Sequence, residues 1–252
     1  MHPAWIVPQW PVPDSVRALI TTRAGGFSRG PWAAVEGAGG MNLGFGADDA
    51  RAVQCNRARL RRCLPQEPCW LTQVHGNVVV DAELAGQLPP ADAAFTTRRG
   101  VVCCVLVADC LPVLLADAGG RGVAAVHAGW RGLAAGVIQN AAAALRRAVG
   151  DETARLVAYL GPAIGPAHFE VGPEVLSAMK QYLPQAQAAF RTAANGKFHA
   201  DLFSLAQMAL QQVRVQDVHG GGQCTMSDPA RFYSYRRDKV TGRHAALVWL
   251  QD

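Results

Sequence analysis

The chain lacks several patterns that would assign it to a well-known class. No two of its seven cysteines are separated by two residues, which excludes a zinc ribbon and a thioredoxin-type motif. The longest apolar run, residues 101–108, is far too short to span a bilayer. Residues 5–14 contain three prolines with no basic segment before them, unlike a signal peptide. We therefore expect a cytoplasmic protein with reduced thiols and no membrane partner.

Charge is also scarce, and it is not strongly clustered. Charged residues make up 17% of the chain and apolar residues 50%, which is typical of a folded protein rather than a disordered one. The formal net charge is +5, and basic side chains concentrate only in residues 57–62 and 235–239. Because no nucleic-acid-binding motif is visible, this balance favours a small anionic partner over RNA or DNA.

Apolar periodicity predicts the fold class. No repeat, linker or change of composition marks a boundary, so residues 1–252 are expected to form one domain. Strands and helices do not alternate strictly, which indicates an α+β fold with mixed sheets covered by helices. Apolar runs predict strands over residues 16–21, 101–108, 111–117, 122–128, 155–160 and 244–250, and a strand pair or one bent strand over 70–80. Helical spacing predicts helices over residues 48–64, capped by Asp48, 133–149, ended by Gly150, 173–183, and one capped by Asp201 that runs to 213.

Three side chains that can bind a metal lie near the expected strand ends. His75, Cys110 and His127 are 35 and 17 residues apart, so only the tertiary fold could bring them together. A catalytic zinc site uses three nitrogen or sulfur ligands and keeps one position open for water. Glycines 76, 129 and 132 flank the histidines, where a close backbone approach would need the absence of a Cβ.

Each of these residues also has an ordinary structural interpretation. A cysteine at the end of an apolar run is usually a small core residue, and a histidine there usually serves a hydrogen bond. A purely structural zinc in a binding module would need a fourth protein ligand. The chain offers five further residues for that position: His168, His199, His219, Cys224 and His244.

Five segments together resemble the YfiH-like family, also called the multicopper polyphenol oxidase or laccase-domain family. They are TQVHG (72–76), ADCLPVLL (108–115), AVHAGWRG (125–132), GPAIGPAHFEV (161–171) and FYSYRRDKVTGR (232–243). The resemblance implies a fold grouped with cysteine-hydrolase-like proteins and a zinc held by His75, Cys110 and His127. It also implies a purine nucleoside enzyme that phosphorolyses adenosine, inosine, guanosine and methylthioadenosine and deaminates adenosine.

The nucleoside activities assign expected roles to further residues. Asp109, beside Cys110, is the expected proton shuttle for deamination, although a structural carboxylate there is equally compatible with the sequence. Phosphorolysis needs a bound phosphate, for which the fork of an arginine is well suited. The expected phosphate ligands are Arg23, Arg131, Arg236 and Arg237. Arg131 is the first choice because it closely follows His127 and precedes a helix.

Two other enzyme classes remain open from the sequence. Cys110 with His127 or His75 as base could form a cysteine hydrolase acting on peptidoglycan precursors, to which the family is also linked. The laccase label implies copper, but seven histidines without any His-x-His pair do not suit a four-copper centre. A single copper at the Cys–His site remains compatible, because copper outcompetes zinc at such ligands. The sequence leaves the oligomeric state open.

Overall fold

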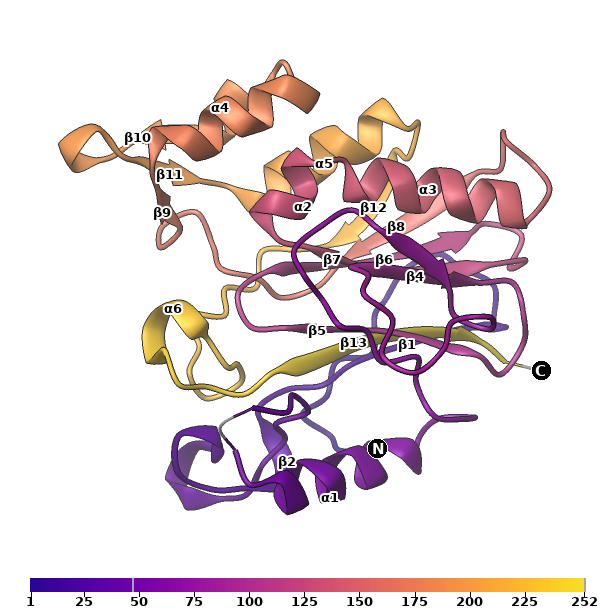
Figure 1. Ribbon diagram of the computed structural model, residues 1–252, viewed down its shortest axis with the longest axis vertical. Coiled ribbons are helices and arrows are strands. Elements are labelled where there is room, and N and C mark those ends of the chain that lie inside the picture. The colour runs from indigo at the N-terminus through magenta and orange to yellow at the C-terminus, as the bar shows by residue number, and fades with distance from the viewer. Residues whose placement is uncertain (47, 252) are drawn as a thin grey trace.

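The computed structural model describes residues 1–46 and 48–251, which pack in four layers (Figure 1). Helices cover one face of a six-stranded sheet, a three-stranded sheet packs on its other face, and α1 (Ala50–Arg61) covers the outer face of that second sheet. The strands are β1 (Val16–Ile20), β2 (Ala24–Ser28), β3 (Val79–Asp81), β4 (Ala93–Thr96), β5 (Val102–Val107), β6 (Leu111–Asp117), β7 (Val123–Ala128), β8 (Leu156–Leu160), β9 (Glu170–Val171), β10 (Phe190–Thr192), β11 (Phe198–Ala200), β12 (Asp217–Gly220) and β13 (His244–Leu250). The other α-helices are α2 (Trp130–Ala134), α3 (Val137–Ala148), α4 (Pro173–Tyr182), α5 (Leu202–Gln212) and α6 (Tyr235–Asp238).

The six-stranded sheet is mixed, with strand order β12-β8-β6-β7-β4-β3. β6 pairs antiparallel with both β7 and β8, whereas β12 pairs parallel with β8 and β3 parallel with β4. The short strands β9, β10 and β11 form a small separate sheet beside α4. The α+β class with mixed sheets covered by helices is therefore confirmed.

The three-stranded sheet is buried on both faces, and alternate side chains of β13 pack on different layers. In the β1-β13-β5 sheet, Ala246 and Val248 of β13 pack toward the six-stranded sheet. Leu247 and Trp249 of the same strand pack toward Leu60 of α1. Because successive side chains of a strand point to opposite faces, a strand buried on both sides reads as a continuous apolar run.

Two predicted elements differ in the structure. Residues 70–78 form no strand and contain one isolated bridge, between Thr72 and Pro90, whereas the strand β3 begins only at Val79, so His75 lies in a loop. The helix expected over 133–149 is broken into α2 and α3, because Gly136 adopts a left-handed conformation (φ 81°).

The ends of three helices lie at or within one residue of their predicted positions. Gly150 follows α3 with φ 72°, as expected for a glycine that ends a helix. Asp201 caps α5 and accepts hydrogen bonds from the backbone N–H groups of Phe203 and Ser204. The cap of α1 is Asp49 rather than Asp48, since the Asp49 side chain accepts from the backbone N–H of Arg51. Among the described residues, no helix combines the length and hydropathy needed to cross a bilayer.

Candidate metal centre

The antiparallel pairing of β6 and β7 brings Cys110 and His127 together. Leu111 at the start of β6 pairs with Ala128 at the end of β7, so Cys110 and Gly129 extend this pairing by one residue on each strand. His127 is buried, with 3% of its surface exposed, and Cys110 is half-buried. Two segments 17 residues apart in the sequence therefore meet at one edge of the sheet.

His75 reaches the same place from the loop after residue 70. Its backbone adopts φ 60°, which is uncommon for a residue other than glycine. The His75 and His127 rings are edge to face, with centroids 4.9 Å apart. One ligand atom from each of His75, Cys110 and His127 lies within 4.8 Å of the others. This group can bind a metal ion.

A buried carboxylate, Asp92, holds both histidines. Its Oδ1 lies 2.8 Å from Nδ1 of His127 and accepts a 2.9 Å hydrogen bond from the backbone N–H of His75. Its Oδ2 accepts from the backbone N–H groups of Gly76 and Val74 at 2.7 and 3.2 Å. These bonds offset the strained conformation of His75 and leave Nε2 of His127 free to face a metal.

Asp92 is the functional residue that the sequence analysis missed. It lies between Ala91 and Ala93, directly before β4, and none of its surface is exposed. A carboxylate is almost never fully buried without a partner, so an aspartate directly before the apolar residues 93–95 was the available signal.

Glycine allows the three ligands to approach one another. A Cβ built on Gly129 would lie 2.9 Å from Sγ of Cys110 and 3.2 Å from Cδ2 of His75. A Cβ on Gly132 would lie 2.8 Å from the backbone oxygen of Gly76. Gly76 itself has room for a side chain, since its nearest contact would be 3.5 Å away. The expected need for a missing Cβ is therefore met at Gly129 and Gly132 but not at Gly76.

The electrostatics favour an ionised thiol beside a protonated imidazole. Burial raises the pKa of the Cys110 thiol, but the charge of His127 and hydrogen bonds from both histidines outweigh it, so the pKa is lowered. Burial lowers the pKa of His127, but the charges of Cys110 and Asp92 outweigh it, so the pKa is raised. A thiolate and an imidazole are the protonation states that bind a metal, whose charge replaces the imidazolium proton.

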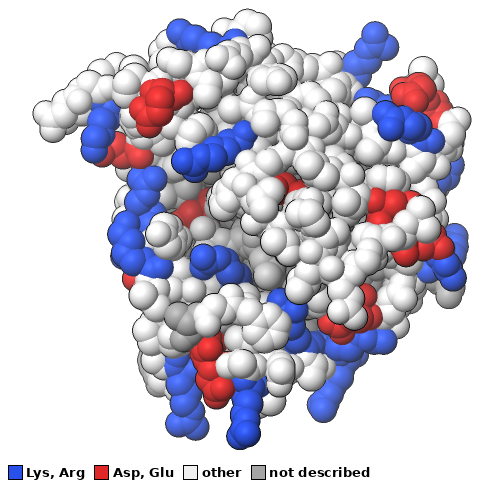
Figure 2. All heavy atoms as spheres, in the orientation of Figure 1, with Lys and Arg blue, Asp and Glu red and all other residues white. Residues whose placement is uncertain are grey.

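The ligand group opens into a pocket of about 890 Å³. Its wall includes four arginines, of which Arg131 and Arg236 were predicted and Arg57 and Arg243 were not. Figure 2 shows a hollow in this face of the molecule with basic side chains along its rim. Arg243 is the last residue of the FYSYRRDKVTGR segment, so its place in that motif was the available signal.

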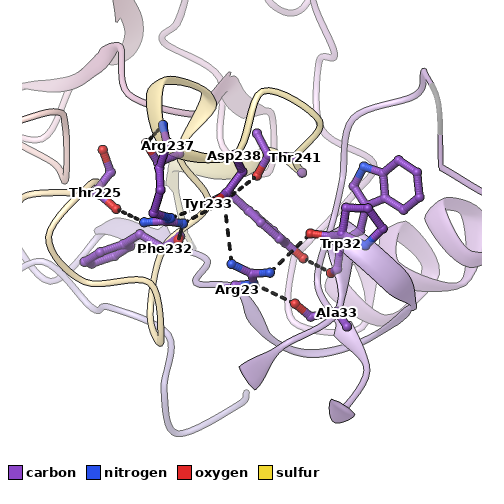
Figure 3. A network of polar contacts seen from close by, with 12 residues as sticks. Arg23, Trp32, Ala33, Thr225, Phe232, Tyr233, Arg237, Asp238 and Thr241 are labelled. Carbon is purple, nitrogen blue, oxygen red and sulfur yellow. Dashed lines mark hydrogen bonds and ion pairs between the residues drawn. The ribbon is translucent and has the colours of Figure 1, made fainter. Parts of the chain in front are cut away.

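The other two predicted phosphate ligands are occupied elsewhere (Figure 3). Arg23 donates to the backbone oxygens of Ala33 and Pro31 at 2.6 and 3.2 Å. Arg237 donates to three backbone oxygens, those of Thr225, Met226 and Phe232, and to both carboxylate oxygens of Asp238. Neither lines the pocket of the metal group. Their guanidinium groups bind loops of the chain together, so the structure does not bring them to the metal group, and their expected phosphate contact stays a prediction.

Asp109 lies beside Cys110 but its carboxylate is fully engaged. Oδ1 accepts a 2.6 Å hydrogen bond from the Thr225 hydroxyl. Oδ2 accepts from the Ser234 hydroxyl at 3.1 Å and from the backbone N–H of Arg236 at 2.6 Å. Asp109 has a positive φ of 86°, which these bonds stabilise. The side chain thus ties the turn that carries Cys110 to residues 225–236.

No fourth ligand joins the group among the described residues. The metal-binding set contains His75, Cys110 and His127 alone. The five further residues considered for a structural zinc line other parts of the fold, since none borders this pocket. Nor do the described residues bring together the histidines that several coppers would need. Three ligands that face a pocket match a site with an open position.

Comparisons with known proteins agree with this arrangement. The family described as multi-copper polyphenol oxidoreductase laccase matches residues 17–251. A Pseudomonas aeruginosa protein named as a purine nucleoside phosphorylase is 51% identical over 251 residues, covering 99% of both chains. The Escherichia coli protein named purine nucleoside phosphorylase YfiH is 43% identical over 251 residues, covering 97% of this chain and 98% of its own.

Solved structures share the whole fold. The crystal structure of a Neisseria meningitidis protein superposes with a TM-score of 0.89 at 43% identity, covering 99% of this chain and all of the other. YlmD from Geobacillus stearothermophilus superposes with a TM-score of 0.85 at 27% identity, covering 95% of this chain and 93% of its own. With a family match along nearly its whole length, the chain belongs to the YfiH family of multi-copper polyphenol oxidoreductase laccase-type proteins.

Proposed function

We propose that the protein is a zinc-dependent purine nucleoside phosphorylase that also deaminates adenosine. The observation that carries this is the group of three ligands, His75, Cys110 and His127, open to a basic pocket. The printed names of the similar proteins from Pseudomonas aeruginosa and Escherichia coli support the phosphorylase part. Adenosine, inosine, guanosine and methylthioadenosine are the proposed nucleosides.

Phosphorolysis breaks the bond between C1′ of the ribose and the purine nitrogen and forms a bond from C1′ to a phosphate oxygen. The proton of hydrogen phosphate goes to the leaving base, so the products are the free purine and ribose 1-phosphate. The arginines of the pocket would hold the phosphate and balance the charge it brings. Phe45 and Tyr235, whose side chains line the pocket and are more than half exposed, offer apolar faces for the purine.

The metal site suits zinc by its donor set. One sulfur and two imidazole nitrogens form a set that zinc prefers, and Asp92 orients one imidazole as in other zinc sites. A bound zinc would supply a Lewis acid at its open position. Copper also fits these donors, so the choice of zinc is part of the proposal.

Deamination exchanges the adenine amino group for oxygen from water and releases ammonia. Asp109 was the expected proton shuttle, but shuttling would require it to give up hydrogen bonds from Thr225, Ser234 or Arg236. We therefore propose that Asp109 positions Cys110 and that its variants act through that cysteine.

A second candidate function has one specific observation in its favour. Cys110, His127 and Asp92 form the series of nucleophile, base and orienting carboxylate that cysteine hydrolases use. In that reaction the thiolate would attack the carbonyl carbon of an amide in a peptidoglycan precursor. His75 argues against it, because the triad does not use a second imidazole beside the sulfur.

Elemental analysis and a nucleoside panel test the proposal together. Protein purified without added metal is expected to contain about one zinc per chain, the number a single three-ligand site holds. Adenosine, inosine, guanosine and methylthioadenosine should each yield free purine only when phosphate is present, and adenosine should yield inosine without it. Full nucleoside activity in metal-free protein would contradict the dependence on zinc. No turnover of any nucleoside, together with cleavage of an amide by metal-free protein, would favour the hydrolase.

A further inference from the structure

The pocket has an excess of positive charge that the chain does not neutralise. Four arginines line it, and among the described residues none of the four forms an ion pair with a carboxylate. The single carboxylate in the lining belongs to Asp109, whose oxygens accept hydrogen bonds from Thr225, Ser234 and Arg236. A cationic group enclosed by protein is stabilised by an anion, so this pocket suits an anionic ligand.

One of the four, Arg243, is held by hydrogen bonds at its backbone and at one guanidinium nitrogen. Its backbone N–H donates to Oδ1 of Asn42 at 2.9 Å, and its backbone oxygen accepts from the N–H of Leu43. Its Nη1 donates to the backbone oxygens of Thr241 and Gly242 at 3.2 and 2.9 Å. Its Nε and Nη2 have no hydrogen-bond partner among the described residues, although the side chain lies in the pocket wall.

The stem of Arg243 also depends on a glycine. A Cβ built on Gly44 would lie 2.8 Å from Cγ and 3.2 Å from Cβ of Arg243. Gly44 therefore leaves the space that the arginine stem occupies. An arginine that is anchored in this way loses little rotamer entropy when it binds a ligand, because its side chain is already ordered.

Arg243 lines the same pocket as the metal-binding group of His75, Cys110 and His127. Burial lowers its pKa, while the charges of Cys110 and Asp109 act to raise it. Arg236 is anchored by one guanidinium bond, from its Nη1 to the backbone oxygen of Glu170 at 2.9 Å. The remaining two arginines are placed differently. Arg131 is exposed, with its guanidinium carbon 4.4 Å from the centre of the Trp130 ring, and Arg57 is stacked 3.8 Å from the Trp70 ring.

From this arrangement we infer that Arg243 binds a phosphate group beside the metal centre, in preference to the exposed Arg131. The inference rests on the proposed function for the identity of the anion, since phosphorolysis consumes phosphate. Two free donors in the fork of a fixed guanidinium match two oxygens of one phosphate. The phosphate could be inorganic or the 5′-phosphate of a nucleotide, because both present the same oxygens.

Kinetics of the zinc-loaded enzyme show whether Arg243 binds inorganic phosphate or the 5′-phosphate of a nucleotide. Arg243→Lys keeps the charge but removes the fork, and should raise the KM for inorganic phosphate about tenfold or more, the size of one lost charge-assisted contact. The KM for the nucleoside should change much less. Gly44→Ala leaves Arg243 in the chain but crowds its stem, and should raise the phosphate KM in the same way.

Two controls accompany these variants. Arg61→Lys alters an arginine that is likewise bonded to backbone oxygens, those of Leu64 and Pro65, but lies outside the pocket, so its kinetics should match the wild type. Inhibition by adenosine 5′-monophosphate forms the second arm. If Arg243 binds a nucleotide phosphate, this inhibition weakens in Arg243→Lys while the KM for inorganic phosphate stays unchanged.

A measurement of phosphate binding by thermal unfolding tests the assignment without relying on enzyme activity. Inorganic phosphate should raise the melting temperature of the wild type and raise it much less in Arg243→Lys and Arg243→Gln. The assignment is wrong if these variants change the binding of neither inorganic phosphate nor adenosine 5′-monophosphate. It is also wrong if Arg131→Ala weakens phosphate binding more than Arg243→Lys does. A wild type that binds phosphate but cleaves no nucleoside would instead overturn the proposed function and leave the phosphate site standing.

Discussion

Gly129→Ala offers the most direct test of how the metal centre is built. Gly129 has φ −67° and ψ 161°, which alanine adopts without strain. The new methyl group, however, would lie 2.9 Å from Sγ of Cys110 and 3.2 Å from Cδ2 of His75. The substitution therefore leaves the backbone unstrained and disturbs two of the three ligands.

The size of the effect follows from these distances. Carbon and its non-bonded neighbours pack at about 3.5–4.0 Å, so the sulfur must retreat by roughly 0.6 Å or rotate away. Metal–ligand distances tolerate only about 0.2 Å of error. We expect zinc affinity to fall about 10- to 100-fold, or about 1.4–2.8 kcal/mol, similar to the loss of a supporting contact. The free energy of unfolding of the metal-free protein should change by less than about 1 kcal/mol.

Competition with a chromophoric zinc chelator measures the affinity, and urea unfolding of the metal-free protein measures the stability. Gly76→Ala is the matched control, because a Cβ there would lie 3.5 Å from the nearest atom, Oδ2 of Asp92, and the N–H bond to Asp92 remains. A Gly129→Ala protein with wild-type zinc affinity would refute the packing argument and place the metal elsewhere.

Three further predictions concern individual groups of the site and core. Metal should protect Cys110, so iodoacetamide should modify it slowly in zinc-loaded protein and faster after chelation, whereas the exposed Cys55 should react equally in both states; equal Cys110 rates would argue against ligation. Asp92→Asn places an amide donor against N–H donors and should destabilise the protein by about 1–3 kcal/mol and weaken zinc binding, as measured by urea unfolding and chelator competition; unchanged values would contradict its role. Burial and the charges of Arg23 and neighbouring arginines lower the pKa of His244 to about 3. The unfolded state therefore takes up the proton first as the pH falls, and from pH 7 to 5 this removes about 2 kcal/mol of stability. His244→Gln should show a shallower pH dependence of urea unfolding, and an unchanged slope would refute the assignment.

Local sequence was sufficient for most secondary structure, and the exceptions have clear causes. The apolar runs of β5, β6, β7 and β13 are long enough to predict strands, because both of their faces are buried. Residues 70–78 are rich in β-branched side chains and yet form a loop. The carboxylate of Asp92 binds three successive N–H groups there, which a strand would have used for pairing.

The arginines show where sequence reasoning fails for a site. Arg237 and Arg243 belong to the same motif and have the same chemistry, but one donates to loop carbonyls and Asp238 while the other keeps two free donors in the pocket. Nothing in the order of residues distinguishes them. Their roles depend on which backbone oxygens come within hydrogen-bond reach after folding.

The sequence by itself determined the types of ligand and their attachment to particular segments, since sulfur and imidazole chemistry belongs to the side chains of Cys110, His75 and His127. Tertiary structure alone decided that these three side chains meet, that Asp92 holds the two histidines, and that Arg243 rather than Arg23 faces the pocket. The physical reason is that a hydrogen bond or a metal site requires positions accurate to a few tenths of an ångström. Residues separated by tens of positions obtain that accuracy only from the packing of the whole chain.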